Sequence, residues 1–120
     1  MNQPNYWVVG ATWEDDNLEE AFYRRGYWEM GYDDGDKPTL AGKRDSMQPG
    51  DRIAVKSRDG QGASTITIKS LGIVKEVADR KVFVNWLVTK MDRQVPCKNY
   101  FGTLHGPIGD ETWIDQAFRL

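Results

Sequence analysis

Tryptophan is the residue type in this chain best suited to forming a binding site, with five in 120 residues. Trp13, Trp28 and Trp86 each stand at the end of an expected element or in a loop, whereas Trp7 and Trp113 fit a strand core and a helix core. Flat aromatic rings stack on an unpaired base, each contributing about 1–3 kcal/mol, or cage a methylated ammonium group. The first three tryptophans are therefore candidate walls of a ligand site.

The charge distribution supplies a second component of such a site. The net charge is −2, but residues 1–42 hold three basic against nine acidic residues, and residues 43–100 hold twelve basic against six acidic. A chain polarised in this way can present one positive face that holds phosphates; the alternative is that the charges are scattered over solvent. The candidate phosphate ligands are Lys43, Arg44, Lys56, Arg58, Lys69 and Lys75. We expect Lys43 and Arg44 to be exposed.

Catalytic and metal chemistry find little support. The chain has no phosphate loop of the GxxxxGK[ST] or GxGxxG type. His105 and Cys97 are the only histidine and cysteine, which excludes an internal disulfide and leaves no zinc-type cluster. We expect His105 to be a hydrogen-bonded structural residue and Cys97 a buried one. The acidic run 33–36 lacks the spacing of a calcium loop. The sequence predicts a protein that is not an enzyme and needs no metal or cofactor.

A β-rich stretch between residues 47 and 88 must position these side chains. Apolar and β-branched alternation predicts strands at 52–56, 65–77 and 81–88, separated by glycine-rich or polar turns. Consecutive strands of this kind form an antiparallel meander, and we expect a barrel closed with a first strand at 6–13. Gly72 lies inside the longest strand, where a bend or bulge is expected.

Three helices and several loops complete the expected elements. A helix is expected from residue 18 to 25 with Gly26 as its terminator, a short helical turn at 39–46, and a final helix at 111–118 capped by Asp110. Residues 27–38 read as irregular, 95–101 as irregular or edge, and 102–108 as a last short strand. The length suits one domain spanning residues 1–120.

The apolar patterning of the sequence bears on the expected location of the protein. No apolar run approaches the roughly 18 residues that a membrane span needs, and the N-terminal residues lack the basic and apolar regions of a signal peptide. We expect a cytoplasmic protein without a membrane partner.

Several motifs resemble those of a known superfamily. The first strand, Tyr6 to Val9, resembles that of EVE and YTH domains. Met47-x-x-Gly50-Asp51-x-Ile53 and the run Leu71 to Val77 are similar to strands of EVE, ASCH and other PUA-like barrels. Most closely, the chain resembles the N-terminal EVE-like domains of McrB-type modification-dependent restriction proteins, on residues 10–13, 26–32, 50–56 and 72–76.

This resemblance implies both a fold and a function. The fold is an α+β, PUA-like (EVE-like) barrel of five to six mostly antiparallel strands with two or three flanking helices. The function is capture of a flipped, modified base in DNA: methylated or hydroxymethylated cytosine, or N6-methyladenine. The implied partners are an AAA+ NTPase and a nuclease of a restriction system. The expected base-pocket residues, combining the resemblance with the tryptophan argument, are Thr12, Trp13, Trp28, Ser46 and Trp86.

Two other functions remain open from the sequence. The same barrel can serve as a sensor domain that binds a small ligand or partner peptide rather than nucleic acid. An ASCH-like hydrolase or RNA-processing factor would need a lysine–carboxylate pair in the cleft, for which Lys56 and Glu76 are the candidates on adjacent strands.

The chain departs from the EVE pattern at one place. Typical EVE domains carry Ser-Glu-Pro at the end of strand one, whereas this chain has Ala11-Thr12-Trp13.

Overall fold

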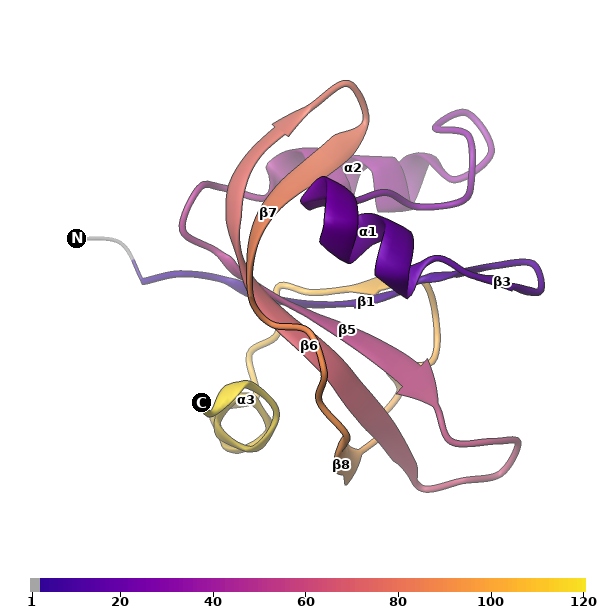
Figure 1. The fold of residues 1–120 in the computed structure, drawn as a ribbon, viewed down its shortest axis with the longest axis vertical. Helices are drawn as coiled ribbons and strands as arrows, with labels where there is room; N and C mark the ends of the chain where they lie inside the picture. The colour runs from indigo at the N-terminus through magenta and orange to yellow at the C-terminus, as the bar shows by residue number, and fades with distance from the viewer. Residues whose placement is uncertain (1–2) are drawn as a thin grey trace.

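One curled, mixed sheet dominates the computed structural model, which describes residues 3–120 (Figure 1). Its strands follow the spatial order β4 (Tyr27–Trp28), β7 (Lys81–Val88), β6 (Thr65–Ala78), β5 (Arg52–Arg58), β1 (Tyr6–Gly10) and β9 (Leu104–His105), with β8 (Arg93–Pro96) paired to the far end of β6. A separate hairpin pairs β2 (Thr12–Trp13) with β3 (Asp16–Asn17). The helices are α1 (Glu19–Arg25), α2 (Pro38–Ser46) and α3 (Glu111–Phe118). The α+β class and the mostly antiparallel sheet are confirmed.

The predicted meander is present, but the predicted closure of the barrel is not. Strands β5, β6 and β7 are sequential antiparallel neighbours. The first strand, β1, runs parallel to β5, and β9 pairs with its other side, so within residues 3–120 the sheet ends at β4 and β9 as a half-barrel. Parallel pairing places the carboxyl ends of β1 and β5 at the same edge.

Gly72 causes the expected irregularity in the long strand. The β6–β7 register shifts between Leu71 and Gly72. A Cβ at Gly72 would lie 2.3 Å from Val84 Cγ1, so only glycine allows the two strands to approach this closely. The β6–β7 register shifts again between Val74 and Glu76, and the β5–β6 register shifts between Val55 and Lys56, beside the end of β5. Shifts of this kind bend strands and increase their twist, as in the curl of this sheet.

Apolar side chains on both faces of the sheet form two cores. In β1, Trp7 and Val9 pack with Phe22 of α1 and Ala41 of α2, whereas Val8 packs in a second cluster, with the α3 residues Trp113 and Ala117. Helices α1 and α2 accordingly lie on one side of the sheet and α3 on the other (Figure 1). The period of two along β1 is what puts successive residues into opposite cores.

The helix ends follow the sequence signals. Helix α1 stops at Gly26, which is left-handed with φ 74°. Asp110 caps α3 by accepting a hydrogen bond from the Trp113 amide at 3.1 Å. Two local predictions were wrong: the expected first strand at 6–13 ends at Gly10, with Thr12–Trp13 in the separate β2–β3 hairpin, and Tyr27–Trp28 is a strand on β7 rather than loop. Among the described residues, no helix is long and apolar enough to span a membrane.

Candidate functional site

A hollow of about 500 Å³ opens where β1 and β5 end side by side. We call it the β1–β5 pocket. Its walls come from the exit of β1, the end of β5, the Tyr32 loop and the turn before β9. The lining residues are Gly10, Ala11, Thr12, Glu14, Tyr32, Lys56, Ser57, Arg58, Phe101, Gly102 and Thr103. A volume of this size lies within the range of small-ligand sites.

Lys56 is the buried polar group of this pocket. Its Nζ donates hydrogen bonds to the carbonyl oxygens of Gly102 at 2.7 Å and Phe101 at 3.2 Å. The side chain is 6% exposed, and no ion pair within 4.0 Å among residues 3–120 involves it. Burial, reinforced by the nearby charge of Arg58, lowers the Lys56 pKa to about 8.

The rim of the β1–β5 pocket carries exposed aromatic rings. Tyr32 is 48% and Phe101 is 39% exposed, and both line the same hollow. The guanidinium carbon of Arg58 lies 5.7 Å from the Phe101 ring centroid, so a cation and a ring already face each other at the mouth. The rim therefore offers flat surfaces and one exposed positive charge.

His105 fixes the turn that carries Phe101 and Gly102. Its Nε2 accepts a hydrogen bond from the Gly102 amide at 2.8 Å, so this nitrogen must be unprotonated. Its ring lies 5.5 Å from that of Tyr100, centroid to centroid. Burial first, and then the positive charges of Lys56 and Lys43, lower the His105 pKa below 6.5. The structural, hydrogen-bonded role expected of His105 is confirmed.

This arrangement predicts a pH-dependent stability. The unfolded chain takes up a proton at the ordinary histidine pKa of 6.5, whereas the folded chain takes it up only at lower pH. The His105 contribution is thus complete above about pH 6.5 and is lost as the pH falls through the window below it. Urea unfolding at pH 7 and pH 5 should reveal this loss in the native chain and a smaller one in His105→Gln. An unchanged pH dependence in the variant would contradict the assignment.

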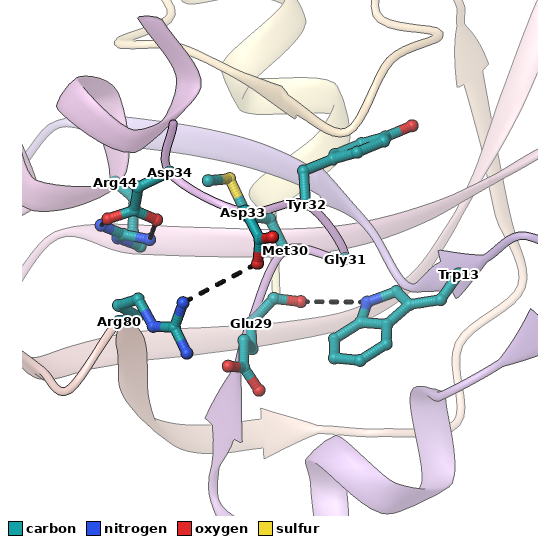
Figure 2. A pocket seen from close by; sticks show the side chains of 9 residues that line it. All are labelled: Trp13, Glu29, Met30, Gly31, Tyr32, Asp33, Asp34, Arg44 and Arg80. Carbon is teal, nitrogen blue, oxygen red and sulfur yellow. Dashed lines mark hydrogen bonds and ion pairs between the residues drawn. The ribbon is translucent and has the colours of Figure 1, made fainter. Parts of the chain in front are cut away.

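A second, smaller hollow of about 170 Å³, which we call the Trp13 pocket, shares Tyr32 with the first. Figure 2 shows the side chains that line it. The Trp13 indole donates from Nε1 to the Glu29 carbonyl at 3.2 Å. A Cβ at Gly31 would lie 2.8 Å from Trp13 Cγ, so the backbone of Gly31 covers part of the ring. Trp13 is therefore half-buried, with limited ring surface for stacking.

An ion pair closes the opposite end of the Trp13 pocket. Arg44 donates to both carboxylate oxygens of Asp34 at 2.8 Å and to Asp45 at 2.9 Å. Arg80 approaches Asp33 at 4.0 Å on the exposed side (Figure 2). Arg44 is 2% exposed and anchors the acidic loop to α2, so the prediction of an exposed, phosphate-binding Arg44 was wrong.

The predicted base-pocket residues do not converge on one concavity. Thr12 lines the β1–β5 pocket and Trp13 the other one. Trp28 is 0% exposed and donates from Nε1 to the Gly10 carbonyl at 2.8 Å, so its prediction as an open pocket wall was wrong. Trp86 packs half-buried against α1 and donates to the Phe22 carbonyl at 3.1 Å. Ser46 is exposed at the end of α2 and lines neither pocket.

The predicted phosphate ligands are also divided. Arg58 is exposed on the pocket rim, and Lys56 is buried in its wall rather than free on the surface. Lys43 is half-buried near His105, and Lys69 is half-buried on β6 outside both pockets. Glu76 is exposed and lies on β6 eight residues beyond Ile68, the register partner of Lys56, so the proposed lysine–carboxylate pair does not form.

Tyr32 and Phe101 are the site residues that sequence reasoning missed. Each lies in an irregular segment, where no periodicity distinguishes an inward ring from an outward one. The one sequence feature that could have identified them is that they are aromatic residues in expected loops. The same feature led to the incorrect prediction of Trp28 as a pocket residue.

Comparisons with known proteins assign no family. Neither a scan against protein-family models nor a search of curated proteins found a match to this chain.

Proposed function

We propose that this chain is a nucleic-acid binding module that holds an unpaired, modified base in the β1–β5 pocket. The observation that carries the proposal is the pairing of two exposed rings, Tyr32 and Phe101, with Arg58 around a hollow of about 500 Å³. A module of this kind in a restriction system would act with an AAA+ NTPase and a nuclease. The curled, mostly antiparallel sheet and the first-strand and Gly50-Asp51 motifs support a PUA-like, EVE-like assignment of the fold.

Each part of the pocket has a role in this proposal. The rings of Tyr32 and Phe101 stack on the base, and Arg58 contacts a neighbouring phosphate. Lys56 offers its remaining hydrogen-bonding position to a polar edge of the base, since two of its positions are occupied by the Phe101 and Gly102 carbonyls. A preformed wall offsets the few kcal/mol needed to unstack a base from a duplex.

Replacing the stacking rings should weaken binding to modified DNA. Because a base–ring stack contributes about 1–3 kcal/mol, Phe101→Ala or Tyr32→Ala should raise the dissociation constant about 5- to 150-fold. The measurement is titration of duplexes carrying 5-methylcytosine, 5-hydroxymethylcytosine, N6-methyladenine or no modification, at fixed salt.

Leu87→Ala provides the matched control. Leu87 is an equally exposed large apolar residue at 43%, and it lines a different surface hollow, beside Tyr6 and Leu120. This variant should bind as the native chain does. An equal loss of affinity in Leu87→Ala, or native affinity in both ring variants, would contradict the proposal that the base binds in the β1–β5 pocket.

A small-ligand or partner-binding sensor is the second candidate function, and Glu14 favours it. Glu14 lies on the lining of the β1–β5 pocket, where its carboxylate repels phosphate. Salt dependence separates the two functions. DNA binding through Arg58 should weaken between about 50 and 200 mM salt, with a slope that falls by about one unit in Arg58→Gln. Salt-independent binding of an uncharged ligand would favour the sensor.

A further inference from the structure

The geometry around Lys56 Nζ leaves one position of its tetrahedral nitrogen unoccupied. Besides its bond to Cε, the nitrogen directs two N–H bonds at the carbonyls of Gly102 and Phe101. In the ammonium form the remaining position is a third N–H, and in the neutral amine it is a lone pair. The two carbonyls therefore satisfy every donor of the neutral amine, which is the nucleophilic form.

Access to this nitrogen runs through the β1–β5 pocket. Lys56 and Gly10 both line the pocket, and a Cβ at Gly10 would lie 3.1 Å from Nζ. Any side chain at position 10 would crowd the amine, so glycine keeps that side of it clear.

The surroundings also favour the neutral form. The side chain is buried, Arg58 contributes a like charge, and no acidic partner pairs with Lys56 among residues 3–120. With a pKa of about 8, about a quarter of the amine is neutral at pH 7.5, against about one in a thousand for an ordinary lysine.

We propose that Lys56 is a reversible covalent capture site for an aldehyde, which within the proposed base-binding function is a base carrying a formyl group. The neutral amine attacks the carbonyl carbon and forms a C–N bond. The carbonyl oxygen leaves as water with both amine protons, giving an imine, and hydrolysis reverses the step. Lysines desolvated in pockets are suited to this chemistry.

The first test uses a small uncharged aldehyde, so that it is independent of nucleic acid. The folded chain is treated with limiting benzaldehyde and sodium cyanoborohydride, which reduces the imine to a stable secondary amine, and peptide mass spectrometry measures labelling at each lysine. Lys56 should be labelled at least about tenfold faster than Lys75, an exposed lysine on β6, and its rate should level off near pH 8. Labelling no faster than at Lys75 would overturn the proposal.

The second test asks whether the aldehyde is a formylated base. Oligonucleotides carrying 5-formylcytosine or 5-methylcytosine are incubated with the chain and cyanoborohydride. A cross-link with the formyl base alone, mapped to Lys56 and absent in Lys56→Arg, is expected. Lys90→Arg, at an exposed lysine that lines neither pocket, should cross-link as the native chain does. Labelling by benzaldehyde without this cross-link would overturn the formylated base as the ligand. A separate measurement tests the nucleic-acid function itself: it fails if none of the oligonucleotides binds non-covalently to the chain.

Discussion

Trp28→Ala should lower the free energy of unfolding by about 3–5 kcal/mol, the usual cost of removing a large aromatic side chain from a core. Trp28 is 0% exposed and packs in the cluster formed by β1, β5, α1 and α2. The substitution also removes the indole donor of the Gly10 carbonyl, which sits at the exit of β1 beside the β1–β5 pocket. Since domains are stable by only about 5–15 kcal/mol, this loss is a large share of the total.

Urea unfolding followed by circular dichroism measures this effect. Trp13→Ala is the matched control because Trp13 is half-buried and its indole also donates to a backbone carbonyl, that of Glu29. It should cost about 1–2 kcal/mol, in proportion to its smaller burial. Trp28→Phe keeps most of the aromatic packing and should cost less than Trp28→Ala, at about 1–2 kcal/mol from the lost hydrogen bond and the small cavity left by the second ring. A Trp28→Ala variant as stable as Trp13→Ala would contradict the core assignment.

The length of a strand decided whether it could be predicted from the sequence. Strands β5, β6 and β7 are long enough for alternation to identify them, and Gly26, Gly72 and Asp110 mark local events that depend on one residue's conformation or side chain. Strand β4 has two residues, too few for any period, and only its pairing with Val82 and Phe83 makes it a strand. Burial of Trp28 follows from that pairing.

The site was less predictable because its residues meet through long-range pairing. Nothing local indicates that β1 should lie parallel to β5, 46 residues away at the Tyr6–Arg52 pair, yet that pairing creates the pocket edge. The burial of Arg44 depends on Asp34, which lies in another loop. In the sequence, Lys56 looks like an ordinary exposed cation of an amphipathic strand. Its burial depends on the distant turn at Phe101 and Gly102, whose carbonyls accept its hydrogen bonds. The residue types indicated an aromatic and basic site, but the tertiary contacts determine which residues form it.

Asp51 provides the second large effect, because its carboxylate joins the first strand to the turn before β5. Its Oδ2 accepts from Trp7 Nε1 and from the Gln48 amide, both at 3.0 Å, and its Oδ1 accepts from the Asn5 amide at 3.1 Å. Asp51 is 4% exposed and Trp7 is 1% exposed, so water has little access to this indole donor. The two motifs Tyr6–Val9 and Gly50–Asp51 are thus linked by one buried carboxylate.

Asp51→Ala should therefore lower the free energy of unfolding by about 2–4 kcal/mol, since a buried donor left unpaired costs about 1–3 kcal/mol and the bonds to a charged acceptor are lost as well. Asp59→Ala is the matched control. Asp59 also accepts from three groups, the side chains of Thr65, Thr67 and Gln94, but it is itself exposed. Only the Thr67 hydroxyl is buried among these donors, so the cost should be about 1 kcal/mol, below that of Asp51→Ala.

A double-mutant cycle then tests the link itself. Asp51→Asn keeps the shape but replaces one acceptor oxygen with a donor, and Trp7→Phe removes the indole donor while keeping an aromatic ring. If the Trp7–Asp51 bond carries the effect, the two changes together should cost less than the sum of each alone, by about 1 kcal/mol or more. Strict additivity, or an Asp51→Ala variant no less stable than Asp59→Ala, would mean that the Trp7–Asp51 bond is not what holds β1 beside β5. In that case the edge on which the β1–β5 pocket forms would not depend on Asp51.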